Sequence, residues 1–279
     1  VWRMATVAGI YHIDRHVRSP QTVAQQFAPV RLVPHNRRVA PKPVGKKLWA
    51  SLEKSMQTVI ETGCAEGQRR DPMHQAEWVV LVDGDLTQIA DIEQAARAFG
   101  VRVVIILDII HVLEYLWKAA KAWLPPDAPQ VAQWVGDKTL QLLQGEVKSI
   151  VRHLRRGATA KGMSSTQREP IDQCATYLVN HAAYLNYPDY LAKGYPIATG
   201  VIEGACRHLV KDRMEITGAR WGLEGGEAVL KLRALVINRD FDAYWDFHEQ
   251  QEYQRNHRTK FSEMPTARPT LQLIAGGKD

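Results

Sequence analysis

Two short apolar runs, each followed by an aspartate, most constrain what this 279-residue chain can fold into. Val79–Val82 leads to Asp83, and Val103–Leu107 leads to Asp108. Continuous β-branched runs of this length are typical of buried parallel strands, and the helical pattern between them, closed by Gly100, completes a β-α-β unit. Open α/β sheets carry their chemistry at the carboxyl ends of the strands, so both aspartates are candidates for a site.

The composition is that of a globular protein with a slight excess of positive charge. Hydrophobic residues make up 45% of the chain, and 36 Lys and Arg stand against 30 Asp and Glu, a weak indication of a polyanionic partner. The three cysteines lack paired spacing, which favours reduced thiols in a cytoplasmic protein over a disulfide framework or a zinc site: Cys64, Cys174 and Cys206. No apolar run approaches the length of a membrane span, so we expect no membrane partner.

The first fifty residues combine a predicted strand with a basic arm. Met4–Ile13 is rich in residues that favour β-strands, and Asp14 follows it directly. No acidic residue occurs from Arg15 to Leu52, and the prolines of Pro29–Pro43 exclude a regular helix there. An arm that contacts nucleic-acid phosphates and an ordinary solvated loop explain this composition equally well. Leu48–Ala65 then has helical spacing.

The remainder of the chain is predicted to be helical. A helix follows Asp108 until Pro125–Pro126, and two long helices, around Leu140–Leu154 and Cys174–Leu185, are joined by a basic loop. The turn Tyr195–Gly200 opens a helix, Val201–Met214, with Glu203 in its first turn, and a last helix covers Gly226–Asn238. Beyond Gln250 the chain is polar without a clear period, and we expect it to be loosely ordered.

Several residues have the chemistry of a site. Asp83 precedes Gly84 at a strand end, where a carboxylate is a natural ligand for Mg²⁺, although on spacing alone a loop carboxylate or a helix cap is the favoured interpretation. Asp108 and His111 are three apart and could pair on one helix face, an arrangement that more often braces a site than reacts. Glu114 extends this row without making it a strong metal signature, and Cys206 and His208 are too close in sequence to aim at one ion.

The motif Asp83-Gly-Asp85-Leu-Thr also matches the nucleophile motif of haloacid-dehalogenase-type phosphatases. In that family the first aspartate attacks phosphorus and the second is the general acid. The family also carries a later strand that ends in paired acids, and Asp108 stands alone. A phosphatase function is therefore the less favoured interpretation.

With these residues in view, the chain resembles DDE-type bacterial insertion-sequence transposases of the ISKra-like group, which are related to Mutator elements. The resemblance covers nearly the whole chain and lies in long blocks: RMATVAGIYHI, KLWASLEKS, VVLVDGDLTQI, LDIIHVLEYLWKAA, ATGVIEGACRHLVKDRMEITGARW and FDAYWDFHE. It implies an α/β ribonuclease-H-like fold with an all-helical insertion before the last catalytic glutamate. The implied segments are a core over 1–125, the insertion over 126–195, the rest of the core over 196–248 and a polar tail over 249–279.

The resemblance also implies roles for single residues. Asp83 matches the second catalytic aspartate and Glu203 the final glutamate, both as metal ligands, while Asp108 and His111 match a supporting D-x-x-H motif. A second assignment makes Asp83 and Asp108 the two aspartates of the triad. The first aspartate of such a triad lies on a strand for which too little chain precedes Leu48, so we expect the sequence to be a fragment that lacks it.

The implied activity is DNA transposition by metal-dependent strand cleavage and transfer, with two Mg²⁺ or Mn²⁺ ions in the complete site. Implied partners are DNA and further copies of the chain, in the bacterial cytoplasm at the nucleoid. The predicted DNA contacts are six basic residues, although for each one taken singly a solvated surface position is the better expectation: Arg155, Arg156, Arg207, Lys211, Arg213 and Arg220. Trp221 could stack on a flipped base, although a packed tryptophan is the better expectation. The alternative function is a DNA-binding remnant without catalysis.

Overall fold

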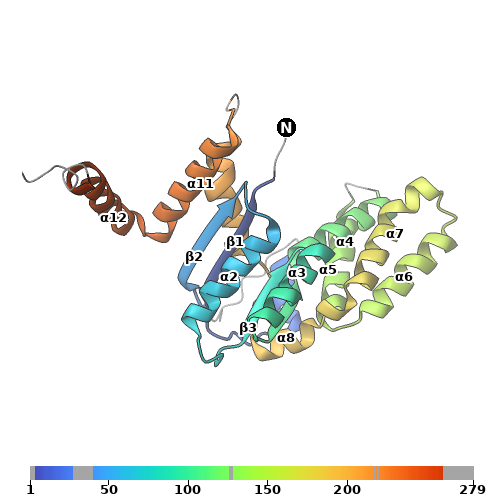
Figure 1. The fold of residues 1–279 in the computed structure, drawn as a ribbon. Helices are drawn as coiled ribbons and strands as arrows, with labels where there is room; N and C mark the ends of the chain where they lie inside the picture. The colour runs from blue at the N-terminus through green and yellow to red at the C-terminus, as the bar shows by residue number, and fades with distance from the viewer. Residues whose placement is uncertain (1–3, 28–39, 126–127, 217, 219, 260–279) are drawn as a thin grey trace, which may run out of the picture. The chain divides into compact units, whose positions relative to one another are not determined.

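The computed structural model describes residues 4–27, 40–125, 128–216, 218 and 220–259 (Figure 1). By the contacts between residues the chain divides into two compact units, Val1–Ala234 and Leu235–Asp279. The boundary falls inside the segment 196–248. Within the described residues no helix is both long and apolar enough to cross a bilayer.

Among the described residues of the first unit, four strands form two pairs. β1 (Thr6–His12) pairs with β2 (Val44–Ser51) in antiparallel fashion, with Ala8 opposite Trp49. β3 (Trp78–Val82) and β4 (Val103–Leu107) are parallel and in continuous register from Trp78 opposite Val103 to Val82 opposite Leu107. The predicted β-α-β unit is confirmed, and with it the mixed α/β class. Its connecting helix α3 (Leu86–Ala98) buries Ile89 and Ile92 against the core.

The predicted helix over Leu48–Ala65 is wrong in its first part. Residues 44–51 form β2, and the helix, α2 (Met56–Arg70), begins only after Ser55, whose side chain accepts a hydrogen bond from Thr58 N. Pairing with β1 decides the conformation of the first part, because it buries Leu48 to 2% exposure. The helical spacing of the sequence continued across a strand, a loop and a helix by coincidence.

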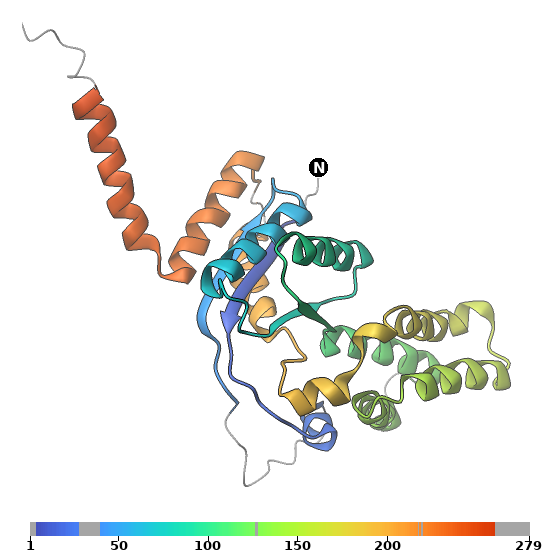
Figure 2. The ribbon, with the colours of Figure 1, turned by 60° about the horizontal axis from the view of Figure 1, so that its bottom comes forward.

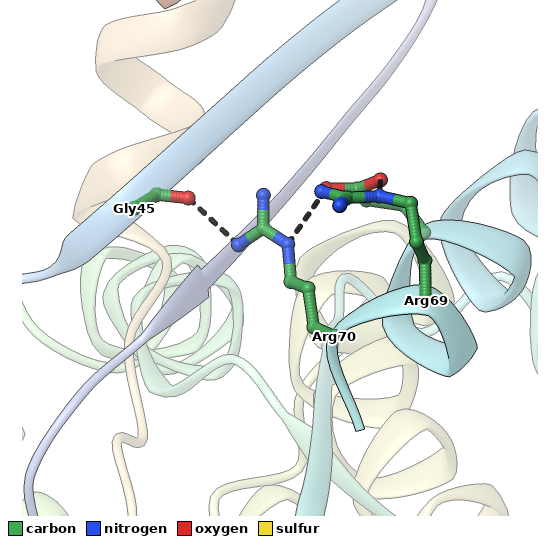
Figure 3. A network of polar contacts seen from close by, with 4 residues as sticks. Gly45, Arg69 and Arg70 are labelled. Carbon is green, nitrogen blue, oxygen red and sulfur yellow. Dashed lines mark hydrogen bonds and ion pairs between the residues drawn. The ribbon is translucent and has the colours of Figure 1, made fainter. Parts of the chain in front are cut away.

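An ion-pair network at the end of α2 ties this helix to the start of β2 (Figure 3). Glu66 accepts hydrogen bonds from Arg69 Nε at 2.8 Å and from Arg70 Nε at 2.7 Å, and Arg70 Nη1 donates to Gly45 O at 2.7 Å. The hydrogen bond from Arg69 lowers the pKa of Glu66 from 4.5 to about 2, with Arg70 adding to the effect against a smaller opposing effect of burial.

The helical block after β4 consists of four long helices rather than three. They are α4 (Ile109–Trp123), α5 (Pro129–Leu143), α6 (Val147–Ala160) and α7 (Ser165–Asn180), which lie side by side in Figures 1 and 2. α4 packs against α5 and α7, and α6 packs against α7. The single helix predicted over Leu140–Leu154 is interrupted at Gly145, whose φ of +82° lies in the left-handed region. The fully buried residues of this block include Leu116, Leu142, Ile150, Leu154 and Leu178.

The chain then returns to the strands through shorter elements. They are α8 (Tyr187–Lys193), α9 (Gly200–Ala205), a π-helix (Cys206–Lys211), α10 (Asp212–Met214) and α11 (Leu223–Asn238). Short helical turns also occur at α1 (Pro20–Ala24), Gln25–Phe27 and Ala182–Tyr184. Buried Glu227 of α11 accepts hydrogen bonds from Ser51 Oγ at 3.1 Å and Leu52 N at 2.8 Å, which fastens α11 to the end of β2.

The second unit contains a helix that we did not predict from the sequence. α12 (Phe241–Tyr253) continues into a π-helical turn, Gln254–Thr259, where we expected loosely ordered chain beyond Gln250. Its aromatic residues are largely exposed, as Trp245 and Phe247 show. The proline-rich part of the basic arm, 28–39, and residues 260–279 of the tail lie outside the described residues.

Candidate functional site at the strand ends

Asp83 lies in the loop that leaves β3, with its side chain exposed. Its Oδ1 accepts a hydrogen bond from Asp85 N at 3.1 Å, and Gly84 between them has a φ of +104°. Asp85 is the N-cap of α3, because its Oδ1 accepts from Thr87 N at 2.7 Å and from Gln88 N at 3.2 Å. The second aspartate of the phosphatase-like motif therefore has a structural role in this loop.

Asp108 has the same position on β4, but it is fully buried. Its Oδ1 accepts from Ile110 N at 2.8 Å, which caps α4, and its Oδ2 accepts from Thr199 N at 3.0 Å and from the Thr199 hydroxyl. Its own amide donates to Val82 O at 2.8 Å, next to Asp83. With three hydrogen bonds to its carboxylate, Asp108 serves as a structural link, which weakens the assignment of Asp83 and Asp108 as two metal ligands.

The hydrogen bonds from Thr199 to Asp108, which we call the Asp108–Thr199 link, hold the start of the Glu203 helix α9 at the end of β4. Ile109 N donates to Ile197 O at 3.0 Å, so residues 197–199 run along the start of α4. Glu203 N donates to Thr199 O at 3.1 Å in the first turn of α9, and the Glu203 side chain is exposed. A hydrogen-bonded path thus runs from the end of β3 through Asp108 and Thr199 to Glu203.

His111 does not pair with Asp108. Its Nδ1 lies 3.9 Å from Glu114 Oε2, and both side chains are substantially exposed. The oxygens of Asp108 are instead occupied by Ile110 and Thr199. Because position 108 caps the helix, its carboxylate turns back onto the first amides of α4, away from a residue one turn later.

Two residues that the sequence reading overlooked contact the Asp83 loop from α7. Tyr177 Oη donates to Asp83 O at 2.7 Å, and His181 Nε2 lies 2.8 Å from Gly84 O. Burial raises the pKa of the Tyr177 hydroxyl, and Tyr115 and the nearby carboxylates of Asp83, Asp108 and Glu114 add to the effect. The available signal was their spacing of four residues, which places both side chains on one face of a helix.

The predicted DNA contacts fall into two separate groups of exposed cations. Arg155 and Arg156 of α6 line a shallow groove of about 490 Å³ together with Val151, Val179 and other residues. The second group follows Glu203. In it Arg207 Nε lies 3.7 Å from Asp212 Oδ1, the Arg213 guanidinium lies 5.4 Å from the centre of the Trp221 ring, and Lys211 and Arg220 are exposed.

The side chains of Cys206 and His208 have different surroundings. His208 Nδ1 lies 2.9 Å from Asp212 Oδ2, whereas burial raises the pKa of the Cys206 thiol, and Glu203 contributes to that rise. Asp14 follows β1 and is exposed.

A metal centre would have to be assembled from few ligands. No three His, Cys, Asp or Glu side chains of the described chain form a group that could hold an ion. The chemistry of single donors does fit a hard cation, because Oδ2 of Asp83 accepts no hydrogen bond within the described residues and Glu203 is exposed. Mg²⁺ is commonly held by one or two carboxylates together with substrate phosphates, which is compatible with these two residues.

Comparison of the chain with protein-family models, with curated proteins and with solved structures finds no match.

Proposed function

We propose that this chain is the catalytic part of a DDE-type insertion-sequence transposase with a ribonuclease-H-like core. In this proposal Asp83 and Glu203 are catalytic carboxylates, and the helices α5 to α8 are the insertion that precedes the glutamate. The observation that carries the proposal is the Asp108–Thr199 link, because it attaches the first turn of the Glu203 helix to the carboxyl end of the β3–β4 pair.

Asp83 and Glu203 would hold divalent metal, Mg²⁺ or Mn²⁺, with DNA phosphate oxygens completing the coordination. Bound in this way, such ions activate water or a 3′-hydroxyl and stabilise the leaving oxygen of an in-line displacement. The proposal assigns no third carboxylate within the described residues. Asp108, with its oxygens occupied, keeps a structural role, and His111 stays outside the carboxylate pair.

The DNA backbone would be contacted by the cations that follow Glu203. Arg207, Lys211 and Arg213 are exposed and lie within ten residues of it, so phosphates bound by them would pass close to this carboxylate. Arg155 and Arg156 on α6 would form a second contact for the duplex.

The test is cleavage of DNA that carries the ends of the element, with and without Mg²⁺, by the wild-type protein and two variants. Asp83→Asn and Glu203→Gln are each expected to reduce cleavage by about 10³-fold or more, since each removes a charged ligand. Glu215→Gln, an exposed acid in the same region, is the matched control and should cleave normally. Normal cleavage by either site variant would exclude the assignment.

DNA binding without catalysis is the second candidate, and the exposed cations favour it because they require no metal. It predicts salt-sensitive retardation of DNA in a gel by a protein that shows no Mg²⁺-dependent nicking. The phosphatase reading predicts instead hydrolysis of a phosphate monoester that is lost in Asp83→Asn and Asp85→Asn.

A further inference from the structure

We infer that Tyr177 and His181 are positioning residues that hold the Asp83 loop from the helical block. Their role in metal binding rests on the proposed function, whereas their role in fixing the loop stands on the geometry alone. The side chains of Tyr177 on α7 and of His181, the C-cap residue of that helix, reach two successive carbonyl groups, Asp83 O at 2.7 Å and Gly84 O at 2.8 Å. In the described chain no other group donates to either carbonyl.

The direction of the His181 bond follows from its surroundings. Nδ1 lies 2.8 Å from Tyr177 O, but that carbonyl already accepts the backbone amide of His181 at 3.1 Å. Gly84 O has the imidazole as its only partner in the described chain. A neutral ring carries one N–H, and placing it on Nε2 gives Gly84 O its donor, while Nδ1 then faces the Tyr177 carbonyl without a proton.

Both donors are held rigidly. Tyr177 is 9% exposed and His181 is 4% exposed, and the Tyr177 ring stacks on Tyr115 of α4 with the ring centres 4.0 Å apart and the planes at 15°. A hydroxyl fixed in this way selects one position for the carbonyl that it contacts, because little freedom remains in its own side chain.

Gly84 makes the close approach of α7 possible. Its φ of +104° is rarely adopted by other residues, and a Cβ at this position would lie 2.8 Å from Tyr177 Oη. The loop and the tyrosine therefore fit together only with glycine here. An Asp-Gly pair at a strand end thus serves the contact with α7 as well as the turn itself.

The Asp83 backbone is fixed on both sides by these contacts. Before it, Val82 O accepts Asp108 N, and after it α7 holds two carbonyls. Asp83 Oδ1 then accepts from Asp85 N at 3.1 Å, so the protection of this one amide reports whether the carboxylate stays in place. The helical block would thereby set the orientation of a metal ligand that it does not itself supply.

The experiment measures hydrogen exchange at the Asp85 amide by NMR in the isotope-labelled full chain. Tyr177→Phe should increase the exchange rate by about fivefold to tenfold, the effect of losing one buried hydrogen bond. The matched control is Tyr187→Phe, which removes a buried tyrosine bond of 2.8 Å to Leu107 O on β4 and should leave Asp85 unchanged. His181→Met should increase the rate, whereas His181→Gln, which keeps a donor, should restore most of the protection.

Unchanged exchange at Asp85 in Tyr177→Phe and His181→Met would overturn the inference, and so would an equal increase in Tyr187→Phe. The exchange result needs neither metal nor DNA, so it is independent of the proposed function. In an active protein, Tyr177→Phe should raise the Mg²⁺ concentration for half-maximal cleavage about fivefold, while the rate at saturating Mg²⁺ stays close to wild type. A lower rate at all Mg²⁺ concentrations would contradict positioning of the ligand.

Discussion

The ends of β3 and β4 place two aspartates at equivalent positions of one parallel pair and give them opposite surroundings. Asp108 is buried and accepts three hydrogen bonds, two of them from Thr199. Asp83 is exposed and accepts one. The difference arises from what the later chain places over each strand end, and it shows that a carboxylate at a strand end becomes structural when another segment satisfies it.

The largest expected effect is on stability, at the buried end. Asp108→Ala should lower the free energy of unfolding by about 3–5 kcal/mol, because it leaves the donors of Ile110 and Thr199 unpaired in the interior. Urea denaturation followed by circular dichroism measures this loss. Thr199→Val provides the companion for a double-mutant cycle, and strict additivity of the two losses would contradict the link.

The next effect concerns the glycine that lets α7 reach the exposed end. Gly84→Ala should cost about 1–3 kcal/mol, since it combines an unfavourable φ with a steric contact to Tyr177 Oη. Gly100→Ala also changes a glycine of positive φ, +63°, but the new Cβ meets no atom within 4 Å, so this variant reports a backbone contribution without a steric contact. An equal loss in both variants would show that the close approach has no energetic weight.

A third carboxylate, Glu66 in the ion-pair network of α2, allows a test by pH. The pKa of Glu66 is lowered to about 2, so its contribution to stability is complete above pH 4.5 and is lost as the pH falls from 4.5 towards 2. The contribution should be about 1 kcal/mol, because Arg69 is largely exposed and solvent screens the pair. Comparing acid unfolding of wild type with Glu66→Gln checks this, and an unchanged pH dependence would contradict it.

The smallest effect on stability is expected at the exposed end itself. Asp83→Asn should change the free energy of unfolding by less than about 0.5 kcal/mol, because its side chain is exposed and the amide oxygen can still accept from Asp85 N. The same variant should abolish metal-dependent cleavage if the proposed function holds. Strong destabilisation would make Asp83 a second structural aspartate and remove the contrast with Asp108.

The sequence was sufficient where a pattern is local and repeated. The β-α-β unit was predicted because two β-branched runs and one helical period lie within thirty residues. β2 was missed because Leu48, Leu52 and Met56 have helical spacing although Ser55 separates a strand from a helix. The pattern could not reveal that β1 pairs with this segment, since pairing depends on a partner distant in the chain.

The sequence indicated single residues of the candidate site but not the surroundings of those residues. Asp83 and Asp108 could be singled out as strand-end carboxylates, but their different burial depends on Thr199, 91 residues beyond Asp108. Tyr177 and His181 looked like ordinary helix residues, because nothing in a single sequence indicates which carbonyl a side chain will reach. The D-x-x-H spacing suggested a pair that the cap geometry of Asp108 prevents.

The Asp108–Thr199 link has a consequence for the order in which the chain folds. The helices of the intervening block are built from local contacts, which form early, whereas this link must close a separation of 91 residues. Until residues 197–199 arrive, the Asp108 carboxylate has only Ile110 N as a partner among the described residues and must stay hydrated. We therefore expect the docking of this segment to be a late step in refolding, one that sets the unfolding rate more than the folding rate.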